Sequence, residues 1–167
     1  AVERAQKDYG LEVLLSTEAT AESLKGKYDK VVVAAGTTDT VLPLPGLDKA
    51  NWQQAVAVLE NPELAKGAKK VVVIGGGVVG SETAYFLKKE LGVEDVTVVE
   101  MDKYIMNHTC TANRGYLLKY MYDSGIKLLN CTKSVSFDEK GVVVSRNTSK
   151  SVPDPYLSWN PILPENV

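Results

Sequence analysis

The sequence predicts an α/β protein with a doubly wound parallel sheet and a short β-hairpin, on three observations. A β-branched run at 71–74, expected to be a buried strand, is followed by an amphipathic helical pattern and a second apolar run at 96–99, the order of a β-α-β unit. A strand is also expected over 30–34, where every residue after Lys30 is apolar, as in a strand buried on both faces of a parallel sheet. Two short segments, 134–137 and 142–145, flank a polar turn and predict the hairpin.

The segments before the β-α-β unit are assigned in chain order. The first nine residues carry a helical apolar pattern that stops at Gly10, and 11–15 is expected to be a short strand. Asn51 is expected to cap a helix that continues to Leu59, because Asn is a favoured N-cap residue. Pro62 is expected to open the next helical turn, since proline fits the first helical position.

After the β-α-β unit, a helix is expected over 112–124 and a strand over 126–129. The last segment, 151–167, holds four of the seven prolines and is expected to be irregular.

Three glycines in the β-α-β unit predict a dinucleotide site. Gly75, Gly77 and Gly80 follow the first strand at the spacing G-x-G-x-x-G. The first glycine permits a tight turn, the second lets a diphosphate approach the backbone, and the third lets the helix pack on the sheet. The start of the helix then points its free N–H groups and positive dipole end at the phosphates. The residues of the loop and helix start expected to bind are Gly75, Gly76, Gly77, Val78, Val79 and Gly80.

Glu100 ends the second strand, where a carboxylate can accept hydrogen bonds from the ribose hydroxyls of an adenosine. Its charge suits a free 2′-hydroxyl and repels the 2′-phosphate of NADPH. The next residues, Met101 and Asp102, supply no cation for that phosphate, and Lys103 is the only basic residue nearby. We therefore expect Glu100 and Met101 to belong to the site, and NADH to be preferred over NADPH.

Composition excludes several classes of partner. The chain has 167 residues and a net charge of −2, so no broad field attracts nucleic acid or an anionic membrane. No apolar run approaches the length of a membrane span, and no signal peptide is visible. Cys110 and Cys131 are the only cysteines, which fits a cytoplasmic protein. We expect no metal site and no catalytic acid or base in this domain.

Beyond these patterns, the sequence resembles a family. The segments 28–36 and 42–48, together with the Gly75 motif, are similar to the middle of a flavoprotein in which a Rossmann-like NAD(P)H domain is inserted into an FAD domain. The segments 107–116 and 128–132 are similar to the 2-enoate reductases and the related 2,4-dienoyl-CoA reductase/NADH oxidase group.

The resemblance implies a domain organisation and a role. It implies that 1–48 is a remnant of the FAD-domain segment and crossover, and that 49–150 is the NAD(P)H-binding domain of a larger two-dinucleotide protein. In such proteins hydride passes from NADH to FAD, and electrons continue to FMN and an enoate C=C bond. The resemblance further implies that Ala35 and Gly36 lie near FAD, and that Glu82 lies near the mouth of the nucleotide site.

The remaining FAD and FMN-barrel domains are therefore the expected partners, and the isolated domain is expected to be inactive. FMN and a 4Fe-4S cluster are implied for the whole protein only, because the cysteine run of such a cluster is absent here.

Other functions stay open on the sequence. An NADH oxidase, a ferredoxin reductase or a disulfide reductase would share the same domain, although the spacing of Cys110 and Cys131 is not that of a redox pair. A non-catalytic NAD-sensing domain and an S-adenosylmethionine methyltransferase are the alternatives from other classes.

Overall fold

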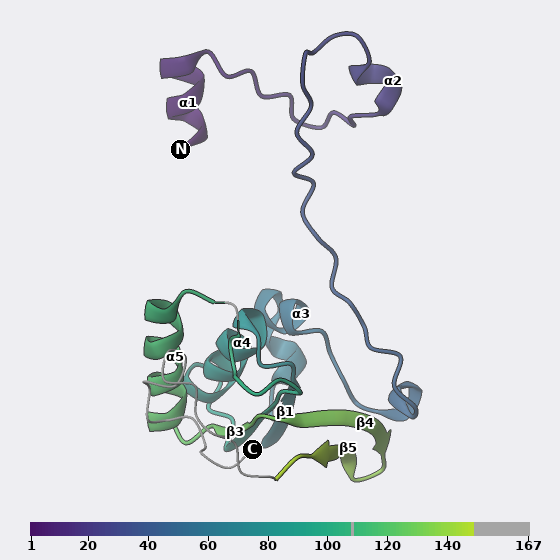
Figure 1. The fold of residues 1–167 in the computed structure, drawn as a ribbon, viewed down its shortest axis with the longest axis vertical. Coiled ribbons are helices and arrows are strands. Elements are labelled where there is room, and N and C mark those ends of the chain that lie inside the picture. Colours follow the sequence, from purple (N-terminus) through teal and green to yellow (C-terminus); the bar gives the residue numbers. More distant parts are fainter. Residues whose placement is uncertain (108, 149–167) are drawn as a thin grey trace. The chain divides into compact units, whose positions relative to one another are not determined.

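The computed structural model describes residues 1–107 and 109–148, and the chain divides into two compact units, 1–38 and 39–167. Each unit is described by itself. In the first, helix α1 (Val2–Tyr9) ends where Gly10 takes a left-handed conformation with φ of 68°, which confirms the predicted helix and its stop (Figure 1).

The first unit continues with helix α2 (Ala21–Leu24). The Thr20 hydroxyl accepts a hydrogen bond from the backbone N–H of Ser23, and the Ser23 hydroxyl accepts one from the N–H of Thr20, so this short helix is closed by a reciprocal cap.

The two strands expected in the first unit are not formed, so these predictions were wrong. The segments 11–15 and 30–34 contain no strand residues, and Val32 and Val33 are 88% and 85% exposed. A β-branched run becomes a strand only when a neighbouring strand satisfies its backbone groups, and no described segment of this unit pairs with it.

The second unit contains a three-stranded parallel sheet in the order β1-β2-β3. This arrangement confirms the Rossmann-like α/β class. Val71 lies opposite Val96 in the β1–β2 register, and Val98 lies opposite Leu128 in the β2–β3 register. The strands and their connecting helices, in chain order, are β1 (Lys70–Ile74), α4 (Val78–Lys89), β2 (Asp95–Val99), α5 (Thr111–Asp123) and β3 (Lys127–Leu129).

The core lies between the sheet and these two helices. Because the strand order steps in one direction and parallel crossovers are right-handed, α4 and α5 lie on the same face and pack against each other. Ala84 and Leu87 of α4 pack with Val96 and Val98 of β2, and all four are buried. The ring centroids of Tyr85 and Tyr120 lie 6.0 Å apart and join the two helices at their outer side.

The strand predicted over 71–74 is formed, but it is buried on one face only. Val73 of β1 is buried with Ala84 and Leu87 of α4, whereas Val72 and Ile74 on the opposite face are 39% and 37% exposed. The reason is that α4 and α5 cover only the face of the sheet on which Val73 lies.

Short helical segments precede the sheet. A 3-10 helix, η1 (Leu47–Lys49), is followed by α3 (Ala55–Glu60), which begins later than the predicted cap at Asn51. The backbone stays extended through Gln54, which is the residue that precedes the helix. Pro62 opens the next 3-10 helix, η2 (Pro62–Ala65), as predicted.

The predicted hairpin is present as the antiparallel pair β4 (Thr132–Asp138) and β5 (Gly141–Arg146). The carboxylate of Asp138 accepts backbone hydrogen bonds from Lys140 and Gly141 and so closes its turn. Next to this turn, the N–H of Phe137 in β4 donates to the carbonyl of Pro45 over 2.8 Å. The hairpin is therefore attached to the crossover that leads into the sheet (Figure 1).

The segment 151–167, expected to be irregular, lies outside the described residues. Within the part of the chain that is described, no helix is long and apolar enough to cross a membrane.

Candidate dinucleotide-binding site

The loop after β1 has the tight turn that its glycines predict. Gly75 has a φ of 100°, a region that favours glycine, and its N–H donates to the carbonyl of Val99 over 2.8 Å. A Cβ atom on Gly80 would overlap the carbonyl oxygen of Gly75. The first and third glycines of the motif are therefore required by the fold itself, because α4 starts directly against the loop.

Gly76, which the motif leaves variable, is enclosed more tightly than its neighbours. Its N–H donates a 2.7 Å hydrogen bond to Oε2 of Glu100. A Cβ atom here would lie 2.9 Å from Cβ of Glu100 and 2.8 Å from Cδ1 of Ile105. The strand-end acid therefore contacts the glycine loop directly, which the spacing of the motif alone does not reveal.

The space beside Gly77 is open, in contrast to Gly76 and Gly80. Among the described residues, no atom outside Gly77, its chain neighbours and the backbone of its own helix lies within 4 Å of the position that a Cβ of Gly77 would occupy, and none of their side chains caps the start of α4. Val78 and Val79, the first residues of the helix, are 40% and 48% exposed. Uncapped N–H groups at the positive end of a helix dipole suit an anion, so the loop fits a diphosphate at this point.

Glu100 is held in place from several directions. Its Oε1 accepts a 2.7 Å hydrogen bond from the N–H of Asp102, in addition to the bond from Gly76 at Oε2. Its own N–H donates to Leu129, and its carbonyl accepts from Thr132. Each carboxylate oxygen has two lone pairs, so the half-buried group keeps acceptor capacity for ribose hydroxyls. Its neighbour Met101 is 66% exposed.

The segment after Glu100 folds back onto the glycine loop. The N–H of Met106 donates a 2.6 Å hydrogen bond to the carbonyl of Gly76, and Met106 has a φ of 55° although it is not glycine. Asn130 at the end of β3 donates from Nδ2 to the carbonyl of Lys103 over 2.7 Å. Arg114 of α5 donates from Nε to the carbonyl of Ile105 over 2.8 Å.

The guanidinium group of Arg114 is buried, with the residue only 5% exposed, and lies 5.7 Å from the centroid of the Tyr104 ring. Burial lowers the pKa of Arg114, and Tyr104 acts in the opposite direction. Arginine titrates so far above neutral pH that the group stays charged.

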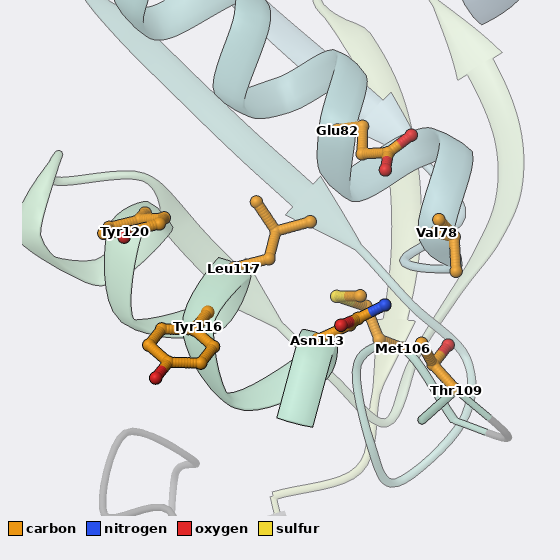
Figure 2. Close-up of a pocket in the computed structure, with 8 residues that line it drawn as sticks. All are labelled: Val78, Glu82, Met106, Thr109, Asn113, Tyr116, Leu117 and Tyr120. Atoms are coloured by element: carbon orange, nitrogen blue, oxygen red, sulfur yellow. The ribbon is translucent and has the colours of Figure 1, made fainter. Parts of the chain in front are cut away.

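A surface pocket of about 430 Å³ lies between α4 and α5 (Figure 2). Val78 and Glu82 come from the first turns of α4, and Met106 and Thr109 come from the segment that folds back on the loop. Glu82 is exposed and reaches into the space between the helices. The residues that line the pocket are Val78, Glu82, Met106, Thr109, Asn113, Tyr116, Leu117 and Tyr120. The pocket therefore continues the site from the start of α4 toward α5.

The structure brings most of the predicted site residues together. The glycine loop, the start of α4, Glu100 and Met101 form one surface, and Glu82 lies beside it in the pocket. Ala35 and Gly36 belong to the first unit, where both are exposed. For all of the predicted site residues, the assignment to cofactor binding stays a prediction.

Sequence reasoning missed the contribution of the segment after Glu100 and of α5. Met106 contacts Gly76 through its backbone, which leaves no side-chain pattern to read. Tyr116 and Tyr120 are four positions apart on α5, and this spacing was the available signal for one side of the pocket. Among the described residues, no group of three or more His, Cys, Asp or Glu side chains is arranged to hold a metal ion.

Comparison with known proteins agrees with this geometry. The family model described as pyridine nucleotide-disulphide oxidoreductase matches residues 2–156. Cinnamate reductase of Clostridium sporogenes is 31% identical over 150 residues, covering 87% of this chain and 22% of the relative. Bilirubin reductase of Mediterraneibacter gnavus is 33% identical over 153 residues, covering 90% of this chain and 23% of the relative.

A solved structure of 2-naphthoyl-CoA reductase in complex with 2-naphthoyl-CoA superposes with a TM-score of 0.68 at 27% identity, covering 90% of this chain and 22% of that one. The chain thus spans just over a fifth of the length of these proteins, 22% to 23%. Since the family model matches nearly all of the sequence, the chain belongs to the pyridine nucleotide-disulphide oxidoreductase family.

Proposed function

We propose that this chain is the NADH-binding domain of a flavin-dependent oxidoreductase that passes hydride from NADH to FAD. The family uses FAD and NAD(P)H, which supports the flavin part of the proposal. The observation that carries the nucleotide part is the contact between Glu100 and the N–H of Gly76. It joins the expected ribose acceptor to the expected diphosphate loop in one surface.

The residues of the chain divide the work of binding. The open side of Gly77 and the uncapped start of α4 receive the diphosphate, and Glu100 accepts the adenosine ribose hydroxyls. Glu82, in the neighbouring pocket, contacts the ribose or nicotinamide at the other end. The nicotinamide supplies the hydride, and the domain contributes by holding it against a flavin, so that no side chain need act as acid or base.

The substrate part of the proposal is the reduction of an enoate C=C bond by the whole protein. Its support is the similarity to cinnamate reductase. The proposal includes FAD and FMN-barrel domains as partners, with FMN and a 4Fe-4S cluster outside this chain, and an inactive isolated domain. It includes no binding to nucleic acid or to a membrane. The cytoplasmic location stays a prediction.

NADH is proposed over NADPH because of the charge at the end of β2. The carboxylate of Glu100 and the exposed Asp102 would both repel a 2′-phosphate. The described neighbour that carries positive charge, Lys103, lies with its Nζ 5.1 Å from the centroid of the Tyr104 ring.

Fluorescence titration with NADH and NADPH tests the proposal. We expect the native chain to bind NADH at least about tenfold more tightly than NADPH. Glu100→Gln should weaken NADH binding by about tenfold, because an amide cannot accept all of the hydrogen bonds of a carboxylate. The same change should reduce the preference for NADH over NADPH. Glu139→Gln, an exposed acid in the turn between β4 and β5, makes the same charge change as a control. Equal affinity for both nucleotides in the native chain would contradict the NADH assignment.

The alternative functions differ in the reaction, if any, of the whole protein to which this domain belongs. Cys110 and Cys131 do not have the spacing of a redox pair, which does not favour a disulfide reductase. Family membership argues against a methyltransferase. Reconstitution with the missing flavin domains would separate an NADH oxidase or an enoate reductase, which transfer electrons, from a non-catalytic NAD sensor, which does not.

A further inference from the structure

We propose that Arg114 is a positioning residue for nucleotide binding. From the first turn of α5 it holds the segment 104–106 against Gly76, and through that contact it fixes the conformation of the glycine loop. The part of this inference that concerns affinity rests on the proposed function, whereas the part that concerns loop order does not.

The first step is the contact of Arg114 with the backbone. Its Nε donates a 2.8 Å hydrogen bond to the carbonyl of Ile105, and the residue is only 5% exposed. A buried guanidinium is costly unless its donors are used, so this carbonyl is fixed relative to α5. Asn130 holds the same segment further upstream, at the carbonyl of Lys103. Of these two side chains, Arg114 binds nearer to the residues that touch the loop.

The second step is the contact of that segment with Gly76. Ile105 is fully buried, and its Cδ1 fills the space where a Cβ of Gly76 would lie. Met106 donates its N–H to the carbonyl of Gly76 over 2.6 Å while its φ is 55°. A non-glycine residue adopts this left-handed conformation at an energetic cost, so the surrounding contacts must hold it there. The bond from Arg114 to the preceding carbonyl is one of them.

The third step is the effect on the loop. The N–H of Gly76 is bound by Glu100 and its carbonyl is bound by Met106, so the peptide groups on both sides of Gly76 are fixed. The next residue is Gly77, from which α4 starts. The direction of the first N–H groups of α4 therefore depends on a path of contacts that begins at Arg114.

Amide hydrogen exchange measured by NMR on the chain 1–167 tests this path without any nucleotide. In Arg114→Met, which keeps an apolar stem but no donor, we expect the amides of Gly76 and Met106 to exchange at least about tenfold faster, while buried β2 amides such as Val98 change little. Arg114→Lys should restore part of the protection, because it keeps a charged donor. Lys119→Met removes the same charge from an exposed position of α5 and should have no effect.

Three results of the exchange experiment would contradict the inference. One is native exchange at Gly76 and Met106 in a folded Arg114→Met chain. Another is equal acceleration at Val98, which would mean that Arg114 supports the whole fold and not the loop. An Arg114→Lys chain that exchanges as fast as Arg114→Met also counts against it.

Should Arg114→Met not fold, exchange in the unaltered chain under low denaturant decides the matter. The Met106 N–H, the Gly76 N–H and the Arg114 Nε–H should then share one opening event that lies below global unfolding. Opening of Met106 while Arg114 stays protected would contradict the inference.

Nucleotide affinity provides the second readout. Arg114→Met should raise the Kd for NADH by about tenfold at a temperature where the chain is folded, and Lys119→Met should not. Faster exchange at Gly76 with unchanged NADH affinity would overturn the positioning role. A native chain that binds no NADH would defeat the proposed function, and the exchange experiment would still decide whether Arg114 orders the loop.

Discussion

At the scale of single residues, Gly77 and Gly80 at the start of α4 have different surroundings, in line with the different roles that the motif gives them. Gly80 faces the carbonyl of Gly75 and leaves no room for a Cβ, whereas Gly77 faces open space. Gly77 has a φ of −70°, which any residue adopts. Gly80 is therefore required by packing, whereas the fold alone does not require a glycine at position 77.

This difference predicts that alanine at Gly80 reduces stability, whereas alanine at Gly77 reduces NADH affinity. Gly80→Ala should lower the free energy of unfolding by about 1–3 kcal/mol, because the backbone has to move away from the new methyl group. Gly77→Ala should change stability by less than about 1 kcal/mol and still weaken NADH binding, because its methyl group occupies the space proposed for the diphosphate. Urea unfolding and NADH titration of both variants check this. Native affinity in Gly77→Ala would place the diphosphate elsewhere.

The sequence predicts residues well where a side chain, or its absence, carries the signal. The spacing of Gly75, Gly77 and Gly80 and the acid at Glu100 are visible in this way. The enclosure of Gly76 and the left-handed Met106 are not, because both arise from backbone contacts between segments that are far apart in the chain. Arg114 is likewise unremarkable in the sequence until Ile105 is placed beside it.

At the scale of elements, periodicity predicts the helices and strands that find a partner. The β-α-β unit and the hairpin appear where expected, because each apolar run has a neighbour to pair with or to pack on. The equally apolar run at 30–34 remains extended and exposed. Local pattern therefore sets the preference for a strand, and pairing decides whether the strand forms.

One ion pair joins two of these elements and gives a pH dependence. Nζ of Lys127 on β3 lies 3.0 Å from the carboxylate of Asp95 on β2, and this hydrogen bond lowers the pKa of Asp95 below its ordinary 3.8. A lowered pKa in the folded state stabilises the fold above the ordinary value, and the contribution is lost as pH falls through the lowered pKa. The side chain of Lys127 is 62% exposed and that of Asp95 is 30% exposed, so water screens the pair and its effect on stability is small.

Asp95→Asn should therefore reduce stability slightly at pH 7, and the difference from the native chain should shrink as the pH falls from 3.8 through the lowered pKa of Asp95. Urea unfolding at several pH values measures this. Lys127→Met should lower the free energy of unfolding by the same amount. The double variant should be no less stable than either single variant. A difference that persists at low pH would assign the effect of Asp95 to something other than the ion pair.

At the scale of the whole molecule, the sequence predicts the family but not how the rest of the protein uses this domain. The family model matches 2–156, while the curated relatives are about four times as long, since the matched part of the chain covers 22% and 23% of them. The second unit contains the whole glycine loop, α4 and Glu100, so nucleotide binding is testable on this chain.

Binding to the folded state alone should raise the thermal stability of the chain. At a free NADH concentration of about 100 times the Kd, the expected stabilisation is about 2.7 kcal/mol, which a thermal shift assay detects readily. S-adenosylmethionine at the same concentration should cause no shift. A shift with S-adenosylmethionine and none with NADH would favour a methyltransferase-like site over the nucleotide site proposed.

The hydrogen bonds that Glu100 accepts from Gly76 and Asp102 are made within the chain itself and require no ligand atom. The carboxylate and the glycine loop are therefore preorganised, so a ligand can bind at Glu100 without a rearrangement of the loop. Association at the adenosine end should therefore proceed in a single fast phase, with little of the ordering cost that slows and weakens ligands which must mould their own binding sites.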